Sequence, residues 1–304
     1  MPRHGWNSTT ISSTGLLVLA MVILQSGAAY AKTLFPLVGP EGATTLRLLF
    51  ASTILCVAWR PWRHRFSPSE RKAVVVYGLA LGGMNILIYK AVDLIPLGIA
   101  VALEFVGPLA VAVLGSRRWL DLFWVALAAC GILLLLPIAD FESSLNPWGV
   151  LYALMAGVCW GIYIVYGKQV AGTLHGGVVT AVGMSVGMFV ALPFGIARAG
   201  ADLFNWKAIR IAIVVSIFSS VIPYSLEIVA LKRIAARTFG VLMALEPVVA
   251  SVLAVLILGE RLTGLQAAAM AMIVAASIGA TAFSGEQNQR QPAETDDPEP
   301  QPPL

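Results

Sequence analysis

Ten apolar stretches, each about 20 residues long, recur along this 304-residue chain and restrict what it can fold into. A helix of about 20 apolar residues is long enough to cross the ~30 Å hydrocarbon core of a bilayer. Charged residues make up only 12% of the chain, whereas soluble domains carry about 25%. The predicted spans are 15–35, 41–59, 73–92, 97–115, 120–138, 147–167, 177–197, 209–231, 238–258 and 262–283.

The fold class that follows is an all-α polytopic membrane protein with ten transmembrane helices, whose short loops leave no room for a folded soluble domain. After the last span, residues 284–304 are rich in proline and acidic residues and almost devoid of apolar ones. Such a segment cannot bury enough apolar surface to fold, so we expect a disordered cytoplasmic tail.

The basic residues lie in alternate loops, although the net charge of +4 might suggest a nucleic-acid partner. The loop 60–72, RPWRHRFSPSERK, is the strongest case, and the opposite loops are mostly acidic; 198–210 is an exception. The positive-inside rule then places both termini in the cytoplasm, and the partner is the lipid bilayer rather than a nucleic acid. The other basic loop residues are Arg117, Arg118, Lys232, Arg233 and Arg237.

Two stretches of the chain resemble each other across its midpoint. Residues 96–118 read PLGIAVALEFVGPLAVAVLGSRR, and residues 240–261 read GVLMALEPVVASVLAVLILGER. Shifted by 142 positions, the triplet Ala-Leu-Glu ending at Glu104 falls on the triplet ending at Glu246. A proline follows each glutamate, and a shared glutamate inside the membrane is rarer than shared alanine or leucine.

The match predicts two five-helix repeats, 15–138 and 147–283. Because five is an odd number, the second repeat enters the membrane upside down. Inverted repeats are typical of secondary transporters, which bind substrate near the midplane between the repeats. The two glutamates would approach that midplane from opposite sides.

A few charged and polar side chains lie inside the spans, where a charge costs roughly 2.5–3.5 kcal/mol on insertion scales. Such groups usually face the bundle interior or a water-filled cavity. An alternative is that they only hold helices together, as Glu227 would by pairing with Lys232, one turn away. The candidates for substrate binding or proton coupling are Glu104, Glu246, Glu227, Arg47 and Asn85.

Charges of both signs suit a small zwitterion. An ionised glutamate can bind an ammonium group or carry a proton, and Arg47 can hold a carboxylate through two hydrogen bonds. Lys90 is near enough to its helix end to reach outward instead. The candidate pocket-lining residues are Gln25, Ser26, Lys90, Trp160, Tyr163 and Tyr224. Ser219 and Ser220 are also polar residues inside a predicted span.

The sequence argues against an enzyme and against bound cofactors or metals. The three cysteines lie singly inside spans, and no His-Glu-x-x-His motif occurs. A Gly-x-Ser-x-Gly match, GMSVG, occurs at 183–187, but it lies inside a predicted span, whereas the three histidines lie at or near loops. An intramembrane enzyme would need such groups within reach of one another.

Five blocks give the chain a family resemblance over residues 15–283. The chain resembles EamA-type transporters of the drug/metabolite transporter superfamily and, among them, the threonine/homoserine exporters of bacterial inner membranes. It differs at Lys90, where a neutral residue is expected. The blocks are AKTLFPLVGPEGATTLRL (31–48), YGLALGGMNILIY (77–89), PLGIAVALEFVGPLAV (96–111), IPYSLEIVALKRIAARTFGVLMALEP (222–247) and LGERLT (258–263).

The resemblance implies an inner-membrane exporter of small amino acids that works by proton antiport and alternating access. Efflux of drugs or other small metabolites through the same fold is the alternative. The sequence leaves open the oligomeric state and which of Glu104 and Glu246 carries the proton.

Overall fold

The computed structural model describes residues 8–92, 94–95, 97–116, 119–135, 146–249, 252–253 and 263–288. Throughout these residues the regular structure is helical, with no strand. The predicted all-α membrane class is therefore confirmed. Five helices in this part of the chain are long and apolar enough to cross a membrane: Phe35–Trp59, Pro68–Ala91, Pro147–Thr173, Gly176–Phe204 and Trp206–Arg233.

In the first half of the chain, helices lie within each of the first five predicted spans, as far as residue 135. The fourth span is divided between two short helices, and the apolar part of the first, Ser12–Gly27, is shorter than a full span. The elements are α1 (Ser8–Ala31), η1 (Lys32–Leu34), α2 (Phe35–Trp59), η2 (Pro61–Arg63), α3 (Pro68–Val92), α4 (Leu97–Glu104), α5 (Val106–Leu114) and α6 (Trp119–Leu135).

The second half begins with two long helices, and a π-helical turn interrupts the next long segment. Most of the ninth span beyond residue 249 and the tail from 289 to 304 lie outside the described residues, and α13 continues past the predicted tail boundary at 284. The elements are α7 (Pro147–Thr173), α8 (Gly176–Ala199), η4 (Gly200–Phe204), α9 (Trp206–Ser216), η5 (Ile217–Val221, a π-helix), α10 (Ile222–Arg233), α11 (Ala236–Met243) and α13 (Gly264–Asn288).

Polar residues cap the helices where the chain leaves a loop. Ser67 and Glu70 form a reciprocal capping box at the start of α3, with Ser67 N donating to Glu70 Oε2 at 2.8 Å and Glu70 N to Ser67 Oγ at 3.2 Å. Asn146 caps α7, and Asn205 caps α9, through side-chain oxygens that accept backbone N–H groups.

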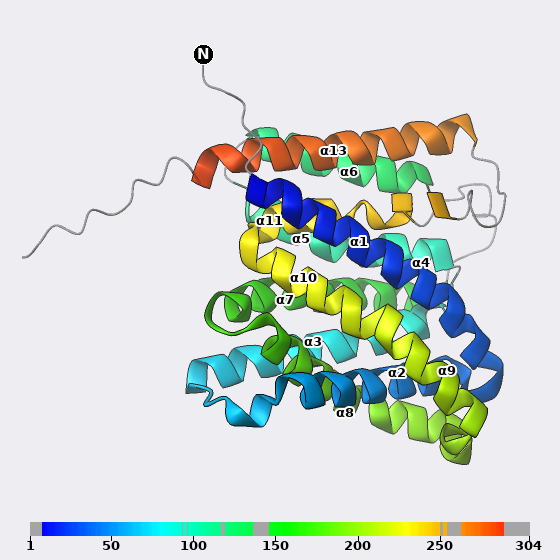
Figure 1. Ribbon diagram of the computed structural model, residues 1–304. Coiled ribbons are helices and arrows are strands. Elements are labelled where there is room, and N and C mark those ends of the chain that lie inside the picture. The colour runs from blue at the N-terminus through cyan, green and yellow to red at the C-terminus, as the bar shows by residue number, and fades with distance from the viewer. Residues whose placement is uncertain are drawn as a thin grey trace, which may run out of the picture.

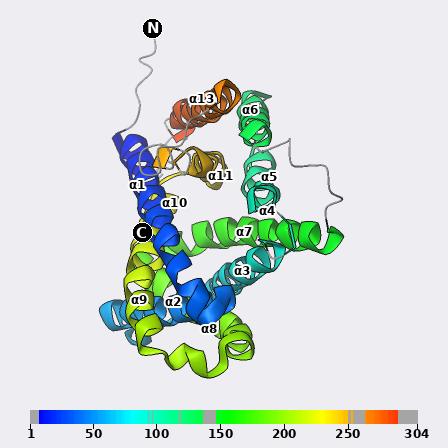
Figure 2. The same ribbon diagram turned by 90° about the vertical axis from the view of Figure 1, so that its right-hand side faces the viewer.

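Helices from the two halves of the chain pack directly on one another. Figures 1 and 2 both show α6 beside α13 and α2 beside α8. In addition, α3 packs on α7, α1 packs on α10 and α5 packs on α11. The buried core therefore lies between helices distant in sequence, and its largest fully buried side chains include Tyr77, Tyr163 and Phe105.

Prolines mark two interruptions of the helices. Pro108 has no N–H to donate to the Glu104 carbonyl, and the helix breaks at Phe105, between α4 and α5. Pro223 likewise leaves the Ser219 carbonyl without an amide, and the preceding turn widens into the π-helix η5. Both interruptions lie inside predicted spans, at the depth where polar candidates gather.

Glycines allow α5 and α7 to approach closely at the first of these breaks. A Cβ added to Gly157 would lie 2.7 Å from the backbone oxygen of Glu104, and one added to Gly107 would collide with the Gly157 carbonyl. Small residues are the usual means of bringing membrane helices into backbone contact. The position of Glu104 thus depends on Gly157.

We expect Gly157→Ala to destabilise the protein, because the backbone of α4 or α7 must move to accept the methyl group. Overpacking of this kind costs about 1–3 kcal/mol. Thermal unfolding of the detergent-solubilised protein measures the effect. The matched control is Gly172→Ala on the same helix, where an added Cβ meets nothing within 4 Å. Equal unfolding temperatures for the two variants would contradict the prediction.

Candidate functional site

Arg47 lies in the interior of the bundle and is held by one side-chain amide. Its side chain on α2 is 9% exposed, and Nη2 donates to Oδ1 of Asn85 on α3. Asn85 in turn donates from Nδ2 to the Leu81 carbonyl at 2.8 Å, which fixes the direction of the amide. The buried Nε of Arg47 has no hydrogen-bond partner, and no described carboxylate lies within ion-pair distance. The guanidinium therefore retains donors for a ligand.

Glu227 on α10 pairs with a tyrosine instead of a lysine. Tyr163 on α7 donates its hydroxyl to Glu227 Oε2 at 2.9 Å. The suggested ion pair between Glu227 and Lys232 is not formed, because Lys232 lies on the exposed side near the end of α10. The ring of Tyr163 stacks on Tyr77 at 4.8 Å and meets Tyr224 edge-on at 6.1 Å.

Glu104 and Glu246 each lie beside a break between helices. Glu104 is the last residue of α4 and is 8% exposed, and Glu246 follows the turn that ends α11. Glu246 lies within electrostatic range of both Glu104 and Glu227. Three acidic groups from α4, α10 and the segment after α11 therefore share one low-dielectric region, where they repel one another when ionised.

Tyr224 connects the acidic groups with the basic one. It is buried on α10 and lies within electrostatic range of Arg47, Glu227 and Glu246. Among the five residues predicted for binding or coupling, Arg47 contacts Asn85, and Glu104 lies within electrostatic range of Glu246. Their role in binding or coupling stays a prediction. Groups of both signs are thus buried in the bundle, on helices from both halves of the chain.

The predicted pocket-lining residues differ from one another in burial and in contacts. Trp160 packs against Phe105 at 4.9 Å, beside Glu104. Ser26 is exposed and donates to the Val22 carbonyl of its own helix, so it does not line this interior. Gln25 is half-buried on α1.

Lys90 lies apart from Arg47, near aromatic rings. Its Nζ is 5.9 Å from the ring centre of Tyr152 on α7 and 5.4 Å from that of Phe194 on α8. Cation–π contacts of this kind stabilise an ammonium group without a carboxylate. Lys90 is thus accommodated between helices of the second half of the chain rather than extended freely into solvent.

Two contributors were not predicted from the sequence. Tyr77 supplies the ring on which Tyr163 stacks, and only its place in an apolar span could have suggested burial. Lys168 on α7 donates from Nζ to the carbonyls of Leu231 at 2.9 Å, Lys232 at 3.1 Å and Ile234 at 2.7 Å. It thereby caps the C-terminal end of α10, and no sequence motif predicts this contact.

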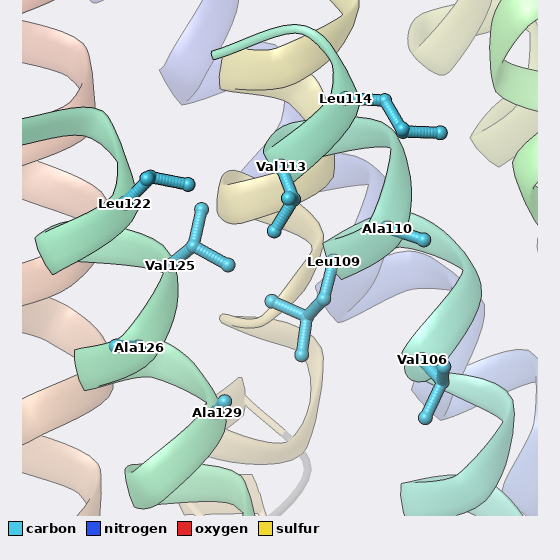
Figure 3. Close-up of a pocket in the computed structure, with 9 residues that line it drawn as sticks. All are labelled: Val106, Leu109, Ala110, Val113, Leu114, Leu122, Val125, Ala126 and Ala129. Atoms are coloured by element: carbon cyan, nitrogen blue, oxygen red, sulfur yellow. The ribbon is translucent and has the colours of Figure 1, made fainter. Parts of the chain in front are cut away.

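An apolar groove lies elsewhere. It has a volume of about 550 Å³ and runs between α5 and α6, where Figure 3 shows only apolar side chains along its walls. Such a lining offers nothing to a charged or zwitterionic substrate. Among the described residues, no group of three His, Cys, Asp or Glu side chains could hold a metal ion.

An ion pair joins the two halves at one end of the bundle. Arg237 at the start of α11 and Asp121 at the start of α6 lie 3.0 Å apart, with side chains that are 12% and 16% exposed. Ser116 and Thr238 lie beside them in a small crevice. The pair links the start of α6 with the start of α11.

Comparison with known proteins identifies related chains. The model of the EamA-like transporter family matches residues 147–282. The threonine/homoserine exporter RhtA of Salmonella typhimurium (strain LT2) is 47% identical over 266 residues, which cover 88% of this chain and 90% of the relative. The same exporter of Escherichia coli (strain K12) is 46% identical over the same coverage.

More distant matches concern the fold. An uncharacterized transporter of Archaeoglobus fulgidus is 25% identical over 259 residues, covering 81% of this chain and 89% of the relative. One crystal structure superposes with a TM-score of 0.72 at 22% identity, covering 91% of this chain and 99% of the other. At that identity the likeness shows a shared architecture only.

We expect Tyr163→Phe to lower the free energy of unfolding by about 1–3 kcal/mol, because it removes the donor to Glu227 and keeps the stacked ring. Thermal unfolding in detergent is the measurement. Tyr166→Phe is the control on the same helix, since Tyr166 is half-buried and makes no hydrogen bond through its hydroxyl to any described residue.

A double-mutant cycle with Glu227→Leu, which leaves the Tyr163 hydroxyl no acceptor at this position, tests whether the effect belongs to this pair. The combined loss should be smaller than the sum of the single losses. Strict additivity would mean that Tyr163 stabilises the bundle independently of Glu227.

Proposed function

Since the chain belongs to the EamA-like transporter family, we propose that it exports small amino acids such as threonine and homoserine, in exchange for protons, across the bacterial inner membrane. Two findings together support amino-acid export. Relatives that are 46–47% identical over most of their length are threonine/homoserine exporters. The interior of this chain holds an arginine with unused donors, and Tyr224 lies within electrostatic range of this arginine and of Glu227 and Glu246.

A zwitterionic substrate fits these groups. The guanidinium of Arg47 is a planar fork that can hold the α-carboxylate through two hydrogen bonds. An ionised glutamate at the region shared by Glu104, Glu227 and Glu246 can hold the α-ammonium group. Substrate binding would then neutralise a buried cation and a buried anion together, which offsets much of the desolvation that each otherwise suffers.

Proton exchange follows from the crowding of the acidic groups. Two ionised carboxylates at close range in a low-dielectric interior repel each other, and either an ammonium group or a proton relieves the repulsion. Substrate and proton can therefore replace one another at the same site. In the proposed cycle, the proton enters as the amino acid leaves towards the outside, and which of Glu104 and Glu246 carries it stays open.

Alternating access requires two bodies that move about this site. We assign these bodies to residues 15–138 and 147–283, as inverted repeats. The pairing of α2 with α8, α5 with α11 and α6 with α13 supports the assignment, since each pair joins corresponding helices of the two halves. The loop charges favour cytoplasmic termini, so the Asp121–Arg237 pair would lie at the inner face, where it can hold that side closed.

We expect Glu104→Gln and Glu246→Gln to leave folding intact and to abolish proton-driven efflux of labelled threonine from proteoliposomes. The amide keeps the size of the side chain but can neither ionise nor carry a proton. Glu70→Gln is the control, because Glu70 caps α3 near a loop and glutamine also serves in a capping box. Efflux at the wild-type rate in both buried variants would refute the coupling role.

Arg47→Lys should raise the KM for threonine by about tenfold or more, because it keeps the positive charge but loses the two-pronged geometry. Arg71→Lys on exposed helical surface is the matched control. An unchanged KM in Arg47→Lys would remove Arg47 from the substrate site.

Efflux of cationic dyes but not of amino acids, tested with the wild-type protein, would favour the alternative of drug export.

A further inference from the structure

Ser220 is a fully buried hydroxyl group without a partner. Its side chain is 0% exposed, and Oγ makes no hydrogen bond to any described residue. It lies in the π-helix η5, inside a segment long and apolar enough to span the membrane. A buried hydroxyl that is not hydrogen-bonded is unfavourable, so this position requires an explanation.

The neighbouring serine shows what a structural hydroxyl does in the same turn. Ser219 is also fully buried, but its Oγ donates to the Val215 carbonyl at 2.7 Å. Its backbone packs on α1, where a Cβ added to Gly27 would lie 2.7 Å from Ser219 N and 2.9 Å from its Cβ. The hydroxyl of Ser219 is therefore used within its own helix, and its side chain lies against α1.

Ser220 shares a helix face with the substrate groups. It precedes Tyr224 by four residues and Glu227 by seven, the spacing that places side chains on one side of a helix. These separations correspond to roughly 6 Å and 10 Å along the axis. Side chains on a helix lean towards its N-terminus, so the Glu227 carboxylate reaches back and narrows the distance to Ser220.

The same turn also contacts the helix of the basic group. Besides α1, η5 packs on α2, which carries Arg47. Tyr224, one turn after Ser220, lies within electrostatic range of Arg47 and of Glu227. A molecule of amino-acid size held by its carboxylate and ammonium groups at these residues would thus direct its side chain towards the π-helix.

We propose that Ser220 recognises the side-chain hydroxyl of the exported amino acid and makes the transporter selective for hydroxylated substrates. The inference rests on the proposed export of small amino acids. A serine hydroxyl both donates and accepts, so it can complete a hydrogen bond with a substrate hydroxyl in either sense. A substrate that lacks the hydroxyl leaves Ser220 unpaired, and sites of this type reject such analogues.

The test compares threonine with 2-aminobutyrate, which differs from it only by the absence of the hydroxyl. Unlabelled amino acid of each kind competes with labelled threonine for exchange in proteoliposomes containing the full-length protein. For the wild type, we expect threonine to compete at least about tenfold better. For Ser220→Ala, we expect that preference to fall close to one. Ser220→Cys, which nearly keeps the volume and hydrogen-bonds poorly, should behave in the same way.

Ser219→Ala is the matched control and should keep the wild-type preference. Ser220→Ala should also keep the wild-type unfolding temperature or exceed it, because the removed hydroxyl has no protein partner. A loss of folding in that variant, or an equal loss of preference in Ser219→Ala, would overturn the inference.

The two proposals fail in different ways. A wild type that exchanges both amino acids without preference, or a Ser220→Ala protein that keeps the preference, overturns the role of Ser220 and leaves amino-acid export standing. A wild type that exchanges neither amino acid overturns the proposed function, and the role of Ser220 with it.

Discussion

The unfavourable free energy of burying a charged arginine in an apolar surrounding constrains the rest of the bundle interior. Arg47 is buried, and the Asn85 amide accepts from it without neutralising its charge. A charge in that position persists in a membrane protein only where an opposite charge, water or a ligand compensates it. The acidic groups of Glu104, Glu227 and Glu246 gather in the same interior, within range of the shared neighbour Tyr224 or of one another. In the proposed mechanism, the carboxylate and ammonium groups of the bound amino acid compensate the charges of Arg47 and of an ionised glutamate.

Interrupted helices bring these groups to the interior. Glu104 ends α4 at the break before Phe105, Glu246 follows the turn after α11, and Ser220 lies in the π-helix that precedes Pro223. Backbone groups released by such interruptions are tolerated in membranes where they face protein or a cavity. Close packing at Gly157 then holds the first break against α7. Proline, glycine and glutamate therefore together place an acidic group at a break inside the bundle. None of these residue types indicates such a site by itself.

Hydropathy predicted the all-helical membrane fold, because the length of an apolar span follows directly from bilayer thickness. The ionisable residues inside the spans were equally evident, since charges are rare there. Their partners were not. Glu227 binds Tyr163 from a distant helix rather than the nearby Lys232, and Ser26 lies on the outer surface although it is polar. Partner choice depends on how α7 and α10 pack and rotate, and the spacing of residues within one helix carries no information about that.

Coupling of amino-acid export to protons can be measured in proteoliposomes. The most direct measurement follows labelled threonine leaving loaded proteoliposomes that contain the wild-type protein, in external buffer of equal or more acid pH, with a pH-sensitive dye trapped inside. We expect faster efflux into acid buffer, accompanied by acidification of the lumen, and loss of the acceleration when a protonophore is added. Efflux that is independent of the pH gradient and moves no protons would contradict this coupling.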